Sequence, residues 1–474
     1  MSRRNITSPT IARLLFAGAA ALLTGLVLPS SSHAIALNCL VPAGQPAASS
    51  QPLRFGIYPG GPAGSVNPKA PPVPEDPAKR LSSLRTLAGS NPFVVRLYTS
   101  WTSGTSTDEV GAWLDRQLAG YTAAGLQVEL VVRYTPAAPD TDVAPAQFAE
   151  YVRGIVGRYG SDPRFVSLQV TNEANLPGAP DASDGEFAGV AEAVVKGVVA
   201  AKDQIRKGDH DQLRVGFSWA YDERPAASTE FWATLGRIGG RTFADAVDWV
   251  GLDSYPGTWS PQLPLTSQLP GLAAGALKES VRSLRDCLMP IAGLGNDTTI
   301  HIAENGFPTG PGRTEDTQAH VLDAMVRSVA AIRGRYGVSD YRWFDLRDSA
   351  TADASIESQY GITRDDYSPK PAFETYRSLI ASHSGAGAAV SAPSSASCQQ
   401  SPVKVEVPRL KQSKRLSLVV RVGSKVVKLA RRSSIPRTVR ISLRSGRSAV
   451  KLRLTAHDKG KRVTRTQQRT YRVC

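Results

Sequence analysis

Two glutamates occupy equivalent places in the sequence, each directly after a short apolar run. Glu173 follows the run Phe165–Thr171 and one asparagine, and Glu304 closes the run Thr299–Ala303. A carboxylate at the end of a buried strand contributes little to packing, but it is well placed to act on a ligand at the mouth of a parallel barrel. Two such carboxyls can cleave a glycosidic bond: one protonates the leaving oxygen, while the other attacks the anomeric carbon or activates water. A solvated loop acid is the alternative for either glutamate alone.

Eight apolar runs predict the strands that would position these glutamates. Loop residues and a segment of helical character follow the runs, and strand alternating with helix favours a parallel sheet. Eight repeats close most naturally into a (β/α)8 TIM barrel. An open doubly wound sheet is the alternative, but no GxGxxG phosphate turn follows the first run. The eight runs are Leu53–Tyr58, Phe93–Tyr98, Leu126–Tyr134, Phe165–Thr171, Leu213–Trp219, Val247–Leu252, Thr299–Ala303 and Tyr341–Phe344.

Segments between the runs have apolar residues three and four positions apart, which predicts helices. Residues 40–380 form the predicted barrel domain, and Tyr367–Ile380 is expected to be its closing helix. Residues 381–397 predict a flexible linker, because 15 of these 17 residues are Ala, Ser, Gly or Pro. The clearest helical segments are Asp108–Gly120, Ala144–Tyr159, Phe187–Arg206 and Thr317–Tyr336.

The positive charge of the chain belongs to its last segment. Residues 398–474 hold 22 Lys and Arg against 2 Asp and Glu, a net charge of +20, whereas the remainder holds 34 against 39. Apolar residues alternate with cations around Val439–Leu443 and Val450–Leu454, which predicts a small antiparallel β domain following the barrel. A segment this basic is expected to bind polyanions such as an anionic cell-wall polymer, and a merely soluble appendage is the alternative. No recognition helix for nucleic acid is visible.

The N-terminus predicts a secretory signal peptide at residues 1–34. Arginines precede an apolar run, Leu14–Leu28, and a small-residue site at Ser32–Ala34 follows it. The run is shorter than the roughly 20 residues that a membrane-spanning helix needs, and no later segment is long and apolar enough to span. We therefore expect a protein secreted or associated with the cell envelope, exported by the general or the twin-arginine route.

Export permits the four cysteines to form disulfides. Cys398 and Cys474 bracket the basic segment and are the expected pair, which would stabilise a domain with a thin core. Cys39 and Cys287 would form the remaining pair. No CxxC pair lies near histidines, so no metal site is expected.

The arrangement Asn-Glu after the fourth run and Glu after the seventh resembles the large (β/α)8 clan of retaining β-glycosidases, clan A. The resemblance covers about residues 50–380. It implies that Glu173 is the acid/base, that Glu304 is the nucleophile and that Asn172 hydrogen-bonds the sugar 2-hydroxyl. Two stretches, VVRLYTSW and ENGFPTG, are similar to family 17, whereas TNEAN and SPKPAF are closer to families 5 or 39. The family stays open.

The same resemblance assigns three further residues. Arg96 would hold the nucleophile ionised, Tyr255 would lie beside it, and Trp343 would form the platform under the reacting sugar. An arginine inside VVRLY would in any case be buried and need a carboxylate partner. Trp219 and Trp259, just beyond strand ends, are further candidates for stacking on sugars.

Packing is the alternative for each aromatic candidate, including Tyr255 and Trp343. His301 lies within a strand, and we interpret it as a core histidine rather than a ligand.

These observations predict a secreted retaining β-glycoside hydrolase that acts on an oligo- or polysaccharide as a monomer without a cofactor. A transglycosylase would use the same residues. A carbohydrate-binding envelope protein without catalysis is the third possibility.

Overall fold

The computed structural model describes residues 52–60, 73–104, 106–137 and 143–384, together with six strand segments between residues 403 and 473. The predicted signal peptide and most of the predicted linker lie outside the described residues. Among the described residues, no helix has both the length and the apolar character required to cross a bilayer.

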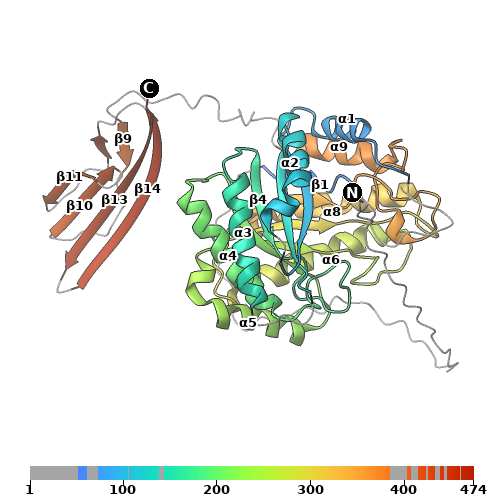
Figure 1. Cartoon of the computed structure of the whole chain (residues 1–474), viewed down its shortest axis with the longest axis horizontal. Coiled ribbons are helices and arrows are strands. Elements are labelled where there is room, and N and C mark those ends of the chain that lie inside the picture. Colours follow the sequence, from blue (N-terminus) through green and yellow to red (C-terminus); the bar gives the residue numbers. More distant parts are fainter. Residues whose placement is uncertain are drawn as a thin grey trace, which may run out of the picture.

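The first eight strands form a closed barrel in chain order, with every neighbouring pair parallel (Figure 1). All eight strands correspond to the apolar runs, so the predicted TIM barrel is confirmed. β4 and β6 are buried at every residue, as expected for strands covered on both faces. The strands are β1 Arg54–Ile57, β2 Phe93–Trp101, β3 Gln127–Tyr134, β4 Phe165–Val170, β5 Arg214–Ala220, β6 Trp249–Asp253, β7 Thr299–Asn305 and β8 Val338–Trp343.

The prediction for the eighth strand was wrong at both ends. β8 begins at Val338, three residues before the predicted start, and it ends at Trp343, so Phe344 lies in the loop. The segment that precedes Tyr341 contains Ser339 and Asp340, which concealed the strand in the apolar pattern. Asp340 can be buried inside the barrel because Arg54 and Arg342 compensate its charge.

Helices connect the strands and surround the barrel (Figure 1). The predicted closing helix is α9, but it begins at Pro371 rather than Tyr367. Tyr367 has a φ of 70°, which is not helical. Lys370, directly before Pro371, is extended, because the residue before a proline disfavours helical angles. The helix therefore starts at Pro371. The helices are α1 Pro77–Ala88, α2 Thr107–Ala123, α3 Ala144–Tyr159, α4 Val190–Lys207, α5 Pro225–Ala244, α6 Leu269–Ser283, α7 Met289–Ile291, α8 Glu315–Tyr336 and α9 Pro371–His383, with a π-helical turn η1 Leu284–Leu288 and a 3-10 turn η2 Ile356–Ser358.

Six charged side chains form an alternating chain through the barrel, which we call the axial charge chain. Its contacts join strands that are not neighbours in the barrel: Arg342 on β8 reaches Glu129 on β3, and Arg96 on β2 reaches Glu304 on β7. The chain therefore crosses the barrel interior. Its successive distances are Arg54–Asp340 2.6 Å, Asp340–Arg342 2.7 Å, Arg342–Glu129 3.2 Å, Glu129–Arg96 2.7 Å and Arg96–Glu304 3.2 Å.

His301 lies beside this chain, and its place in the core is confirmed. Its ring stacks on Trp249 with 4.1 Å between centroids, and Nε2 lies 3.1 Å from a carboxylate oxygen of Asp340. Burial lowers the pKa of His301, so the ring is neutral near pH 7.

The C-terminal segment forms antiparallel sheets, which confirms the predicted β character. Leu418 and Val420 are fully buried. In the strand register Leu418 lies opposite Leu454, and Val420 lies opposite Leu452. Four strands pair in the order β11-β10-β13-β14, and β9 pairs with β12. These strands are β9 Val403–Glu406, β10 Arg415–Val422, β11 Lys425–Arg432, β12 Thr438–Ile441, β13 Gly446–Asp458 and β14 Lys461–Val473.

Cys287 is the one cysteine among the described residues, and it is not a free thiol. Cys39, Cys398 and Cys474 lie outside the described residues. Both predicted pairings therefore stay predictions.

We predict that Arg342→Met lowers the free energy of unfolding by about 3 to 5 kcal/mol, because it leaves Glu129 and Asp340 buried with one cation fewer. The control is Arg327→Met on α8, whose exposed pair with Asp323 should contribute at most about 0.5 kcal/mol. Denaturant unfolding of both variants measures the difference. Equal losses would contradict a structural role for the axial charge chain.

Candidate active site

The turn after β4 carries Glu173 in an unusual backbone conformation. Thr171 and Glu173 have φ values of 66° and 47°, in the left-handed region that side chains other than glycine rarely adopt. Such residues cost about 1 to 3 kcal/mol each and persist where the surroundings hold them. The turn places Asn172 and Glu173 at the carboxyl ends of the strands, where a barrel enzyme has its site.

Asp184 and Ser218 hold this turn. Asp184 accepts hydrogen bonds from the backbone N–H groups of Asn172 and Tyr134, each at 2.8 Å, and it is ion-paired with Arg133 at 2.9 Å. The hydroxyl of Ser218, on β5, accepts the N–H of Glu173 at 3.0 Å. Sequence reasoning missed both residues, because neither the loop before α4 nor the middle of β5 carries a motif that would reveal these contacts.

Asn172 is almost fully buried and already hydrogen-bonded within the protein. Its Nδ2 donates to the carbonyl oxygen of Ala182 at 2.9 Å, and its Oδ1 accepts from Gln169 at 3.1 Å. An amide nitrogen has two hydrogens, so one donor remains for a ligand.

Glu304 lies on β7 among groups that stabilise a carboxylate. Oε1 faces Arg96 Nη2 at 3.2 Å and accepts a hydrogen bond from the Tyr98 hydroxyl at 2.5 Å. Oε2 accepts one from the Tyr255 hydroxyl at 2.8 Å. Arg96 and Tyr255 therefore lie where the sequence placed them, beside Glu304. Tyr98 is an additional neighbour.

Glu173 has very different surroundings. It is buried, with 8% of its surface exposed, and within the described part of the chain no cation forms an ion pair with it. Burial raises the pKa of Glu173 well above its usual value, and the negative charges of Glu304 and Asp253 raise it further. This setting favours the protonated form of Glu173, which has no guanidinium beside it such as the one beside Glu304.

A third carboxyl, Asp253 at the end of β6, completes the cluster. One carboxylate oxygen each of Glu173, Asp253 and Glu304 lies within 4.8 Å of the others. Sequence reasoning missed Asp253, although it follows the run Val247–Leu252 just as Glu304 follows its own run. Carboxylate clusters can hold metal ions, but here the guanidinium of Arg96 already lies beside Glu304 as a cation. We assign no metal to this cluster.

The aromatic platform prediction was wrong for Trp343. Its side chain is 0% exposed, because the last residue of β8 faces the packed interior. The next residue, Phe344, is half-buried at the mouth, where its ring stacks on Tyr58 at 5.1 Å and packs edge-on to Tyr255 at 6.3 Å. Phe344 therefore presents a partly exposed aromatic surface beside Tyr255.

The other two tryptophan candidates differ in their exposure. Trp219 is 1% exposed and packs in the core, so its assignment to sugar binding was wrong. Trp259 is 49% exposed in the loop after β6, and its backbone N–H donates to the carbonyl oxygen of Tyr255 at 3.1 Å. Trp259 remains available for contact with a ligand.

A cavity of about 440 Å³ lies next to Glu304, because Tyr98 lines the cavity and also donates a hydrogen bond to Glu304. Tyr58 and the exposed Trp113 line it as well, together with charged side chains that include Arg80 and Glu75.

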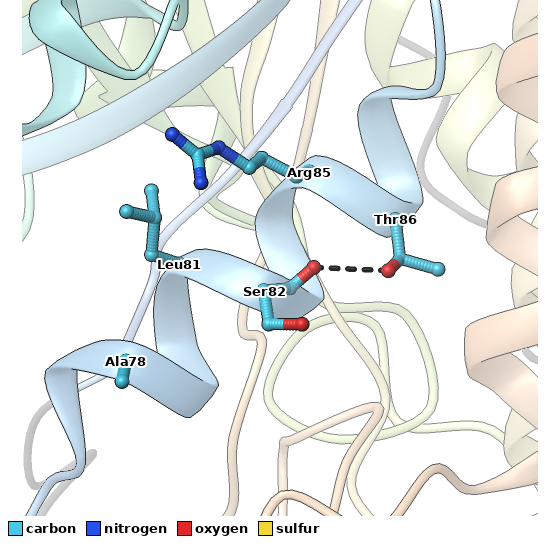
Figure 2. Close-up of a pocket in the computed structure, with 5 residues that line it drawn as sticks. All are labelled: Ala78, Leu81, Ser82, Arg85 and Thr86. Atoms are coloured by element: carbon cyan, nitrogen blue, oxygen red, sulfur yellow. Dashed lines mark hydrogen bonds between the residues drawn. The ribbon is translucent and has the colours of Figure 1, made fainter.

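A second cavity of similar volume lies along α1, far from these carboxyls in the sequence (Figure 2). All five lining residues belong to α1, and Thr86 bonds back to the Ser82 carbonyl at 2.9 Å. With Arg85 as its one charged group, this cavity offers no acid or base for catalysis.

Solved structures share this barrel. A GH5_18 variant from Bifidobacterium longum, in complex with Manβ1-4GlcNAc, matches with a TM-score of 0.51 at 13% identity, over 70% of this chain and 79% of that one. A family 39 glycoside hydrolase from Bacteroides cellulosilyticus matches with a TM-score of 0.46 at 14% identity, over 83% and 79% of the two chains. A β-glucuronidase from Bifidobacterium dentium matches with a TM-score of 0.43 at 15% identity, over 71% of this chain and 47% of its own. No protein-family model and no curated protein matches the sequence.

Asp184→Ala is predicted to destabilise the protein by about 3 kcal/mol, because it leaves two buried N–H groups and Arg133 without their acceptor. Asp181→Ala is the matched control, since Asp181 is exposed and contributes its backbone carbonyl to the same arginine. Chemical denaturation of both variants tests this. A loss below about 1 kcal/mol in Asp184→Ala would show that the turn does not depend on this carboxylate.

Proposed function

We propose that this protein is a glycoside hydrolase that cleaves O-glycosidic bonds with retention of configuration. The observation that carries the proposal is the unequal setting of two glutamates whose carboxylate oxygens lie within 4.8 Å. Glu304 faces the guanidinium of Arg96 and accepts hydrogen bonds from two tyrosine hydroxyls. Glu173 faces no cation, which favours its protonated form. In sites of this kind, the different surroundings of two carboxyls decide which one acts as the acid and which one acts as the nucleophile.

In the proposed mechanism, Glu304 attacks the anomeric carbon while Glu173 gives its proton to the departing oxygen. The new bond joins the Glu304 oxygen to the anomeric carbon as the glycosidic carbon–oxygen bond breaks. Glu173, now a carboxylate, then takes a proton from a water that attacks the same carbon and releases Glu304. Two inversions give net retention. A separation of about 5 to 5.5 Å suits this route, whereas inversion needs about 6.5 to 9.5 Å.

The substrate that we propose is an oligo- or polysaccharide. Aromatic faces suited to a sugar are available in two places. Tyr58 and Trp113 line the cavity that includes Tyr98, and Phe344 packs against Tyr255, while Trp259 is exposed in the loop after β6. The barrel is shared with a GH5_18 variant in complex with Manβ1-4GlcNAc, which supports the proposal of a carbohydrate ligand.

We also propose that the protein is secreted and that its basic C-terminal segment retains it on an anionic cell-wall polymer. The net charge of +20 over residues 398–474 supports this, because such a segment attracts polyanions in a salt-dependent way.

Glu304→Gln is predicted to reduce turnover of β-glycosides on the order of 10⁴-fold or more, since the amide cannot form the glycosyl ester. Glu173→Gln should reduce hydrolysis about 10²- to 10⁴-fold for poor leaving groups, and much less for aryl leaving groups that depart without a proton. The exposed Glu230→Gln is the control. Release of reducing sugar from a panel of β-glycans and aryl glycosides measures all three. Glycan binding without any release by the wild-type protein would refute the enzymatic function.

A chain ending at Gly387 is predicted to keep its hydrolytic activity and to lose retention on cell walls at low salt. The full-length chain should detach from the walls as salt rises, because exposed charges are screened. Sedimentation with isolated walls across a salt series measures both chains. Equal retention of the two would refute the anchoring role.

A further inference from the structure

Asp253 is the member of the carboxyl cluster that the proposed mechanism does not use. It is 2% exposed and forms no ion pair among the described residues, and the hydroxyl of Ser218 lies beside it. One of its oxygens nevertheless lies within 4.8 Å of oxygens of both Glu173 and Glu304. A buried carboxyl in this position must either find a compensating charge or keep its proton.

The cations nearby are already matched. Along the axial charge chain, the three guanidinium groups of Arg54, Arg96 and Arg342 face three carboxylates. Those carboxylates are Asp340, Glu129 and Glu304. Arg133, which lies on the Glu173 side, is ion-paired with Asp184.

Asp253 and Glu173 are therefore two further acids with no cation of their own. If both ionised, the cluster would hold two buried negative charges a few ångströms apart without compensation, which is strongly unfavourable. Burial raises the pKa of Asp253 well above its usual value, and the charge of Glu304 raises it further, whereas Arg96 lowers it.

We propose that Asp253 is a positioning acid that carries a proton in the resting protein and shares protons with Glu173, so that the acid form of Glu173 persists to higher pH. The proposal rests on the proposed role of Glu173 as the catalytic acid. The charged or polar groups that interact with Asp253 come from five neighbouring elements. They are Arg96 on β2, Glu129 on β3, Glu173 after β4, Ser218 on β5 and Glu304 on β7.

Two acids this close titrate as a pair. Loss of the first proton leaves one negative charge, and this charge resists loss of the second proton. The second step, which removes the last proton available to Glu173, therefore falls at a higher pH than it would for Glu173 alone. A neutral side chain at position 253 would abolish this resistance.

The first measurement is the pH profile of kcat/KM for Asp253→Asn on a β-glycoside with a poor leaving group. The expected result is an alkaline limb that moves to lower pH by about one unit, because Glu173 then titrates alone. Asp248→Asn is the control: Asp248 lies at the opposite end of β6 in an ion pair with Lys202, and its variant should keep the wild-type limb. A uniform loss of rate with an unmoved limb would overturn the proposal.

The second measurement needs no substrate. Between about pH 4 and the raised pKa of Asp253, the folded state binds more protons than the unfolded state, so stability falls as pH rises. In Asp253→Asn the slope of the free energy of unfolding against pH should be less negative, by an amount equivalent to up to one bound proton. Unfolding at a series of pH values measures this slope. A slope equal to that of the wild type would overturn the proposal.

The two measurements separate the failure of this inference from the failure of the proposed function. If the wild-type protein hydrolyses no glycoside, the enzymatic function fails and with it the role toward Glu173, while the unfolding slope still decides whether Asp253 holds a proton. Should Asp253→Asn not fold, Asp253→Ser, which is smaller and does not titrate, replaces it in both experiments.

Discussion

The contact between Arg96 and Glu304 is the interaction on which the site depends. Arg96 is 1% exposed and divides its donors among Glu129, Tyr98 and Glu304. A buried guanidinium is tolerated because Glu129 compensates it at 2.7 Å, and Glu129 in turn is compensated by Arg342. The cation that faces Glu304 at the mouth is therefore held by charges that extend down the barrel to Arg54. Stability and electrostatic control of the site have the same source.

On the opposite side of the site, backbone hydrogen bonds to buried side chains position the catalytic turn, and the ion pair between Asp184 and Arg133 supports them. The turn at Thr171 and Glu173 lies in the left-handed region, and the carboxylate of Asp184 and the hydroxyl of Ser218 hold its N–H groups. Glu173 thus projects from a strained but fixed turn into a space without cations. One rim of the barrel stabilises negative charge and the other stabilises a proton. This asymmetry is what a double displacement requires of its two carboxyls.

Much of this architecture could be predicted from the sequence. Strands buried on both faces must be apolar, so the eight runs stood out, and the two glutamates were conspicuous because they end such runs. An arginine within an apolar strand implied a buried carboxylate partner, which the structure supplies as Glu129 and Glu304.

The rest depends on contacts that no local pattern encodes. Asp184 reaches the turn after β4 across 12 residues of loop, and Asp253 meets its neighbours because β6 lies between β5 and β7 in the closed barrel. At β8 the resemblance to clan A placed the platform at Trp343, but Trp343 is buried as the last residue of the strand and the half-buried Phe344 follows it. A motif compared by sequence alone does not show which of two adjacent aromatic side chains is exposed.

The anomeric configuration of the first product tests the central claim most directly. Proton NMR of a β-glycoside during its hydrolysis would detect the sugar before it mutarotates. The two carboxyls have oxygens within 4.8 Å of each other; one faces a guanidinium, and burial raises the pKa of the other. This arrangement predicts that the β-anomer appears first. Initial release of the α-anomer would require a water between the two carboxyls, and it would contradict the assignment of Glu304 as the nucleophile.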